Sequence, residues 1–143
     1  MAVVFRTTRR VEFADTDMAG IVHFANFFRY MEAAEHEFLR ARGLSVALDW
    51  EGRHLGFPRV SASCDFQSPV RFEDVLDIEL ELAKVGRKSL TFAFTFRHAG
   101  RLIARGQLGT VCCLLRPGQP LESIEIPPGV RQRLLGAPEN GPV

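Results

Sequence analysis

One long helical pattern, followed by several alternating patterns, constrains this fold more than any other feature of the sequence. Between about Phe24 and Arg42, apolar residues recur at helical spacing and form a single stripe, which consists of Phe27, Met31, Ala34 and Phe38. A helix of about five turns must bury such a stripe against another element. The predicted strands provide one large apolar surface, the inner face of a sheet. We therefore predict an α+β domain in which a curved antiparallel sheet of about five strands wraps around one central helix.

The strands are predicted from segments in which apolar and polar residues alternate, a pattern typical of half-buried antiparallel strands. The expected inward rows are Val3, Phe5, Val11 and Phe13; Val60, Ala62, Cys64 and Phe66; Leu76, Ile78, Leu80 and Leu82; and Leu90, Phe92, Phe94 and Phe96. A fifth, less regular run extends from Leu102 to Leu115. Residues 98–101 predict a tight turn, and Gly43 predicts the end of the helix.

The remaining segments are predicted to be irregular. We expect residues 44–57 to form a loop, and the tail from about residue 128, which is rich in Pro and Gly, to be loosely held. The whole chain, residues 1–143, is then one domain.

Composition and charge exclude several classes of function. The formal net charge is only +1, and no long apolar stretch occurs, so we expect neither a nucleic-acid partner nor a membrane. The three cysteines, Cys64, Cys112 and Cys113, show no metal-ligand spacing and cannot all pair, which indicates a reducing, cytoplasmic protein. Twelve Phe beside one Tyr and one Trp predict a dense apolar interior or an apolar pocket.

The segment FADTDMAGIVHFANFFRYME, residues 13–32, places two carboxylates between the first strand and the helix. If the strand alternation continues, Asp15 and Asp17 lie on the inward side. An aspartate in such a loop is most often a turn former or a cap, and we favour that role for Asp15. Asp17 lies nearer the apolar stretch, where a poorly solvated carboxylate becomes more reactive.

Two longer segments resemble a known family. EFADTDMAGIVHFANFFRYMEAA, residues 12–34, and FEDVLDIELELAKVGRKSLTF, residues 72–92, are similar in composition and order to the hotdog-fold thioesterases of the 4-hydroxybenzoyl-CoA thioesterase type. The likeness covers roughly residues 5–127. It implies a hotdog fold, hydrolysis of an acyl-CoA thioester without metal or cofactor, and a homodimer or homotetramer with shared active sites.

The resemblance also implies a catalytic role for Asp17, as a nucleophile or as the general base for water. The helix N-terminus just downstream supports this role, because its free backbone N–H groups can bind the thioester oxygen as negative charge develops. We expect the backbone N–H near His23 or Phe24 to act in this way. For the His23 side chain three roles are open: orienting water, contacting substrate, or forming a hydrogen-bonded wall.

The remaining implied residues would bind substrate. Glu32 matches an acidic position that reaches the distal group of the substrate in the aromatic-acyl enzymes, or it is an ion-paired helix residue. The cluster of Phe24, Phe27 and Phe28 is expected in part in the acyl pocket and in part in the core.

The basic turn Arg87-Lys88-Ser89 would bind the phosphates of CoA, or it is simply a solvated hairpin end.

Two other functions fit the same fold. An enoyl-CoA hydratase or dehydratase would pair Asp17 with His23 as acid and base. A non-catalytic acyl-CoA-binding module would keep the pocket without turnover, since fold alone never proves activity.

Overall fold

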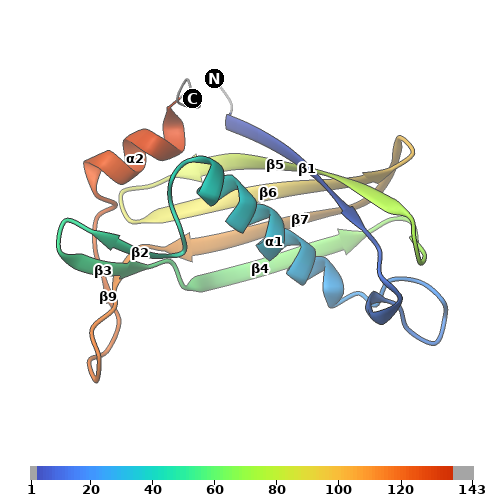
Figure 1. The fold of residues 1–143 in the computed structure, drawn as a ribbon, viewed down its shortest axis with the longest axis horizontal. Coiled ribbons are helices and arrows are strands. Elements are labelled where there is room, and N and C mark those ends of the chain that lie inside the picture. The colour runs from blue at the N-terminus through green and yellow to red at the C-terminus, as the bar shows by residue number, and fades with distance from the viewer. Residues whose placement is uncertain (1–2, 137–143) are drawn as a thin grey trace.

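The computed structural model describes residues 3–136 and contains a five-stranded antiparallel sheet with the order β1-β5-β6-β7-β4. Helix α1, Asn26–Ala41, lies against one face of this sheet (Figure 1). The strands are β1, Val3–Arg10; β4, Arg59–Phe66; β5, Val75–Val85; β6, Ser89–His98; and β7, Arg101–Val111. The predicted α+β arrangement of a curved sheet around one long helix is confirmed.

The centre of the sheet follows the predicted alternation. Strands β5 and β6 pair with Leu80 opposite Phe94, and every residue of their two expected inward rows is buried. The turn after β6 is also confirmed, because Ala99 and Gly100 both have positive φ angles, 49° and 81°, as a two-residue hairpin requires. The two long central strands therefore form the floor on which the helix packs.

Helix α1 buries the predicted stripe, Phe27, Met31, Ala34 and Phe38, against this floor. It approaches β7 closely at Gly106, where an added Cβ would overlap the Met31 sulfur. The helix ends as predicted before Gly43, whose φ of 70° is the left-handed conformation that glycine adopts readily.

Strand β4 departs from its predicted orientation. Val60, Ala62 and Phe66 were expected to face the core, but all three are exposed and only Cys64 is partly buried. The strand lies at the edge of the sheet, so a neighbouring strand covers it on one side alone. An irregular register between Arg59 and Ser61 further disturbs the alternation.

The prediction of a loop over residues 44–57 is wrong, because this region forms half of a second, four-stranded sheet. Its strands are β2, Ala47–Trp50; β3, Arg53–Gly56; β8, Cys113–Leu114; and β9, Glu122–Ser123. Each has at most four residues, too few to show a period in the sequence.

The prediction of a loosely held tail is also wrong for residues 128–135. They form helix α2, Pro128–Leu135, which begins with a proline at its first turn. Val130 and Leu134 are fully buried and belong to the same hydrophobic cluster as the α1 stripe. Within α2, Pro and Gly start the helix or allow close packing rather than loosening the chain. Residues 137–143 lie outside the described residues.

Candidate active site

Asp15 anchors the loop between β1 and α1. It ends the short helix η1, Phe13–Asp15, and its Oδ2 accepts hydrogen bonds from the Glu12 N–H at 2.9 Å and from the Tyr30 hydroxyl at 2.8 Å. Burial and this hydrogen bond raise the pKa of Tyr30. The Asp15 carbonyl accepts from the Asn26 amide at 2.8 Å. Asp15 therefore shapes the loop, as the sequence indicates.

Asp17 lies at the start of a tight turn that η1 leads into. Its carbonyl accepts the Gly20 N–H at 2.9 Å, and Gly20 has a φ of 78°. Its Oδ1 accepts the Ala19 N–H at 2.9 Å. The other carboxylate oxygen accepts no hydrogen bond from any residue in the range 3–136. One oxygen is thus fixed by the backbone and the other is available to a ligand.

The expected inward orientation is wrong for Phe13 and Asp17, although Asp15 is half-buried and its carboxylate contacts the buried Tyr30. Phe13 is 76% exposed, and Asp17 is exposed as well. The reason is local, because β1 ends at Arg10 and the η1 turn breaks the two-residue period of the strand.

A pocket of about 460 Å³ opens beside Asp17. Its polar lining residues are Asp17, Gln67 and Ser68. Apolar side chains form the rest of the wall: Ile21, Val22, Phe24, Phe27, Phe66, Pro69 and Val70. A mostly apolar concavity with a few convergent polar groups is the usual form of a small-molecule site.

The three phenylalanines at the start of α1 separate in the structure. Phe24 is 61% exposed and packs edge-to-face on Phe66 at the pocket wall. Phe27 is buried and touches both the pocket and the core, where it packs against Phe96. Phe28 packs against the core and does not line the pocket. The open choice between pocket and core is therefore resolved separately for each ring.

The structure places His23 beside the pocket lining rather than in it. Its ring stacks on Phe24 with centroids 4.6 Å apart, and its Nδ1 accepts the Ala25 N–H at 3.1 Å. Its backbone N–H donates to the Asp15 carbonyl at 2.9 Å and is therefore not free for a substrate oxygen. The Phe24 N–H, by contrast, has no acceptor among residues 3–136. This geometry favours a hydrogen-bonded packing role for the His23 side chain, behind the Phe24 ring, and leaves Phe24 as the candidate backbone donor.

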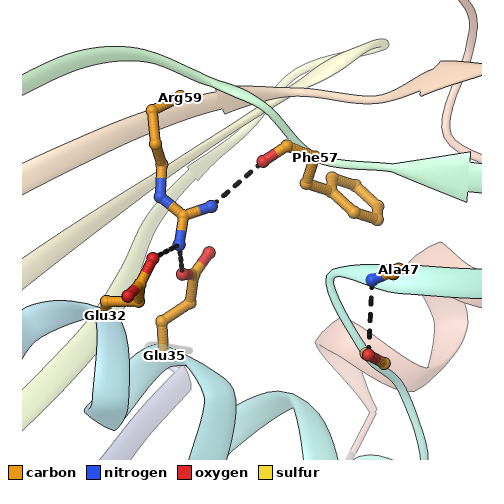
Figure 2. Close-up of polar contacts among 6 residues, drawn as sticks. Glu32, Glu35, Ala47, Phe57 and Arg59 are labelled. Atoms are coloured by element: carbon orange, nitrogen blue, oxygen red, sulfur yellow. Dashed lines mark hydrogen bonds and ion pairs between the residues drawn. The ribbon is translucent and has the colours of Figure 1, made fainter. Parts of the chain in front are cut away.

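Glu32 lies outside the pocket lining, in a charged cluster between α1 and the edge strand β4 (Figure 2). Arg59 reaches across to Glu32 at 3.5 Å, pairs with Glu35, and donates to the Phe57 carbonyl at 3.0 Å. Within one chain the ion-paired role of Glu32 is thus the one that the contacts support.

Glu35 was not identified from the sequence, although its spacing gives a signal. It follows Met31 by four residues and therefore falls on the buried face of α1. Only 1% of its surface is exposed. Burial raises the pKa of Glu35 to about 7, despite the opposing effect of Arg59.

The basic turn Arg87-Lys88-Ser89 joins β5 to β6 at the opposite end of the sheet from Asp17 (Figure 1). The pocket loop lies beside Val70, just before β5, and β5 spans 11 residues, which corresponds to about 35 Å. Arg87 pairs with Glu125 at 2.7 Å, and Lys88 lies 3.5 Å from the Ser123 hydroxyl. One chain therefore does not bring this turn to Asp17.

Gln67 and Ser68 were missed by the sequence reasoning. Both backbone N–H groups donate to the Ile103 carbonyl, at 2.8 and 3.1 Å, which fixes the segment after β4. Their position directly after a predicted strand was the available signal.

Among residues 3–136, no group of three or more His, Cys, Asp or Glu side chains is arranged to hold a metal ion. No helix in this range has the length and apolar character needed to span a bilayer.

Comparison with known proteins identifies the family. A model of the thioesterase-like superfamily matches residues 11–134. The chain belongs to this superfamily. It is 32% identical over 142 residues to the 4-hydroxybenzoyl-CoA thioesterase of Pseudomonas sp. (strain CBS-3), with 89% of this chain and 94% of that protein covered.

Solved structures of thioesterases superpose well on this member of the superfamily. A 1,4-dihydroxy-2-naphthoyl-CoA thioesterase from Synechocystis is 25% identical, with a TM-score of 0.80 over 92% of this chain and 96% of that one. A gentisyl-coenzyme A thioesterase is 30% identical, with a TM-score of 0.77 over 91% and 99%. The resemblance, the hotdog fold and the assignment as an acyl-CoA thioester hydrolase are confirmed at the level of the family.

Proposed function

We propose that the protein hydrolyses an acyl-CoA thioester with Asp17 as its catalytic carboxylate. The observation that supports this most directly is the position of Asp17, which lines a pocket with otherwise mostly apolar walls and has one oxygen without a hydrogen bond among residues 3–136. A carboxylate oxygen that is free beside a pocket can act as a base toward water or as a nucleophile toward a bound carbonyl carbon.

Two routes are open for the chemical step. Asp17 takes a proton from water as the water oxygen attacks the carbonyl carbon, or Asp17 attacks directly and water then cleaves the resulting anhydride. In both routes the carbon–sulfur bond breaks and CoA leaves as a thiolate. We assign the Phe24 N–H to the carbonyl oxygen, because it is unengaged within residues 3–136 and precedes the positive end of α1. Neither route needs a metal or a cofactor.

The acyl group that the pocket favours is aromatic. Phe24 and Phe66 line its wall and pack edge-to-face on each other, and an aromatic group packs well in offset or edge-to-face contact with such rings. The CoA thioesters that name the three relatives above all have aromatic acyl groups, which agrees with this choice.

The active form that we propose is a homodimer or homotetramer with shared sites. The catalytic pocket and the basic turn lie at opposite ends of one sheet, so a CoA that engages both must receive its phosphate contacts from a second copy. The edge strand β4 borders the pocket and exposes Val60 and Phe66, which suits strand pairing with that copy.

We also propose that the enzyme works in the reducing environment of the cytoplasm. All three cysteines are free thiols, as expected in the cytoplasm.

The hydratase alternative is disfavoured by the position of His23. A hydratase needs an imidazole close to the reacting carbon as acid or base. Here the Nδ1 of His23 accepts a hydrogen bond from the Ala25 N–H, and His23 does not line the pocket.

The test is free-thiol release from a panel of aromatic and aliphatic acyl-CoAs by the parent, by Asp17→Asn and by the control Asp77→Asn. Asp77 is exposed on β5 and lies outside the pocket. We expect Asp17→Asn to lose activity by at least about a hundredfold, with an unchanged melting temperature, while Asp77→Asn keeps it. Equal rates for parent and Asp17→Asn would refute Asp17 as the catalyst. Binding of CoA with no turnover of any thioester would favour the binding-module function.

A further inference from the structure

Two consecutive polar residues enter the apolar pocket directly after strand β4, and the chemistry proposed for Asp17 does not use them. Besides Asp17, the polar residues that line the pocket are Gln67 and Ser68. Residues on a regular strand point alternately to its two faces, so two neighbours do not normally line the same cavity. The local backbone accounts for this exception.

A β-bulge brings both residues to the pocket. The last pair of the β4–β7 ladder is Phe66 with Ala104. In a regular ladder, Gln67 alone would then face Ile103. Instead, the backbone N–H groups of Gln67 and Ser68 both donate to the Ile103 carbonyl, at 2.8 and 3.1 Å. Two residues opposite one partner define a bulge, a feature that re-aims side chains and is common next to active sites.

The segment that contains the bulge is anchored on both sides. Before the bulge, the Phe66 ring packs edge-to-face on the Phe27 ring, with centroids 5.3 Å apart. After it, Val70 is buried, and its carbonyl accepts the Val22 N–H at 2.9 Å, which ties the segment to the loop of the proposed catalytic carboxylate. Pro69 restricts the backbone between these anchors. The two polar side chains therefore project from a fixed part of the pocket wall.

The fold itself does not use the polar groups of these side chains. The Gln67 amide and the Ser68 hydroxyl make no hydrogen bond with any residue in the range 3–136. Both groups donate and accept, so together they can hold one neutral polar group through more than one hydrogen bond. A ligand that displaces water from them without replacing its hydrogen bonds is bound more weakly. A well-matched ligand therefore carries a polar atom at this place.

The other lining residues restrict which polar group fits. Among the described residues that line the pocket, none is Lys or Arg, so a substrate carboxylate would lie without a cation and near the carboxylate of Asp17. A substrate ammonium would pair with Asp17 and reduce its basicity. A hydroxyl avoids both effects, because it can donate to the Gln67 carbonyl oxygen and accept from the Ser68 hydroxyl.

We infer that Gln67 and Ser68 are specificity-determining residues, which bind a hydroxyl group on the aromatic ring of the acyl group. This inference rests on the proposed function and narrows its substrate class to hydroxylated aromatic acyl-CoAs. Phe66, the residue before the bulge, lines the wall on which the ring would pack. Three consecutive residues thus recognise the ring and its hydroxyl together.

The first experiment compares kcat/KM for benzoyl-CoA with that for the 2-, 3- and 4-hydroxybenzoyl-CoAs. Gln67→Met keeps the length of the side chain and removes the amide, and Ser68→Ala removes only the hydroxyl. Gln107→Met is the matched control, because Gln107 is also exposed but lies on β7 outside the pocket. We expect the parent and Gln107→Met to favour at least one hydroxylated ester over benzoyl-CoA by about tenfold or more. Gln67→Met and Ser68→Ala should lose most of this preference, while their rates with benzoyl-CoA stay within about twofold of the parent rate.

The unsubstituted ester distinguishes recognition of the hydroxyl from a structural role, since damage to the fold would slow all esters alike. Equal slowing of all esters in Gln67→Met and Ser68→Ala would overturn the inference. A parent that does not discriminate between the esters, or a preference that persists in both variants, would also overturn it. If only Glu32→Gln abolishes the preference, the hydroxyl is bound by Glu32 instead.

Calorimetry separates failure of this inference from failure of the proposed function. In phenacyl-CoA, a methylene group between the carbonyl and the sulfur prevents hydrolysis, and the hydroxyphenacyl-CoAs add the ring hydroxyl. We expect the parent to bind one hydroxylated analogue about tenfold more tightly than phenacyl-CoA, and Gln67→Met to bind both alike. Thioester hydrolysis without any preference for a hydroxyl would refute this inference alone. Tighter binding of the hydroxylated analogue without hydrolysis of any thioester would refute only the proposed function.

Discussion

At the scale of single residues, Glu35 shows how a buried charge is tolerated in α1. It lies on the stripe that packs toward the sheet, and Arg59 reaches it from the edge strand. Removing a carboxylate from water costs free energy that one cation only partly offsets, so the neutral form is favoured in the folded protein. Protonation of Glu35 and folding are therefore coupled.

The pH dependence of stability follows from this coupling. The pKa of Glu35 is about 7 in the folded protein and 4.5 ordinarily. The stabilisation of the fold that comes from protonated Glu35 is therefore complete below pH 4.5 and is lost as the pH rises through about 7. Relative to Glu35→Gln, we expect the parent to lose up to about 3 kcal/mol of unfolding free energy between pH 4.5 and 8.5. Urea unfolding across this range measures it, with exposed Glu81→Gln as the control. If the unfolding free energies of parent and Glu35→Gln change with pH in the same way, the prediction is contradicted.

Residue patterns in the sequence identified some site residues and missed others for definite reasons. The motif located Asp17, Phe24 and Phe27, which the fold does bring to one pocket. It could not show that the His23 N–H is already engaged, since this depends on a bond to the Asp15 carbonyl across the loop. Gln67 was not identified either, because its position directly after a predicted strand does not show which pocket the residue lines.

At the scale of elements, long periodic segments were predictable and short ones were not. α1, β5 and β6 each show several repeats of their period, and their buried faces agree with the pattern. β2 and β3 have four residues each, and α2 starts with Pro and Gly, so tertiary contacts rather than local patterns define them. The clearest of these contacts is the one between Trp50 and Gly129.

That contact predicts the effect of Gly129→Ala. Alanine favours a helix more than glycine does, yet its Cβ would come within 2.6 Å of the Trp50 ring. We expect a net loss of about 1–3 kcal/mol in unfolding free energy, because the added methyl group forces α2 and the Trp50 ring apart. Chemical unfolding measures this loss, and Gln132→Ala on the exposed side of α2 is the control. A Gly129→Ala variant that is more stable than the parent would show that the Trp50 ring can move aside at little cost in free energy.

At the scale of the whole molecule, the two edges of the main sheet differ. The β1 edge exposes Val4 at 38%, whereas the β4 edge exposes Val60 at 65% and lies beside the pocket. An uncovered apolar edge strand favours pairing with another chain. The assembly of copies is thus expected through β4.

Substitution at each edge tests this assembly. We expect the parent to scatter light as a dimer or tetramer at micromolar concentration, and Val60→Asp to shift it toward monomer with a loss of thioesterase activity of at least about tenfold. Val4→Asp on β1 is the matched control and should leave the oligomeric state and the thioesterase activity unchanged. A monomeric parent with full activity would exclude a shared site.

The sequence motifs predict two ends of a site, Asp17 and Arg87, but not the distance between them. Asp17 and Arg87 each lie in a segment that resembles the family, and the order of these segments along the chain gives no information about their separation. The structure shows that the extended strand β5, which is about 35 Å long, runs between Asp17 and Arg87.

This separation has a genetic consequence. If each site takes its carboxylate from one copy and its phosphate contacts from another, a chain with Asp17→Asn and a chain with Arg87→Ala are each defective for different reasons. In a mixed two-fold dimer, one site combines the intact Asp17 of the Arg87→Ala chain with the intact Arg87 of the Asp17→Asn chain. Half of the dimers are mixed when the chains associate at random, so about a quarter of all sites are restored. Two alleles that each fail alone would then complement each other when expressed together in one cell.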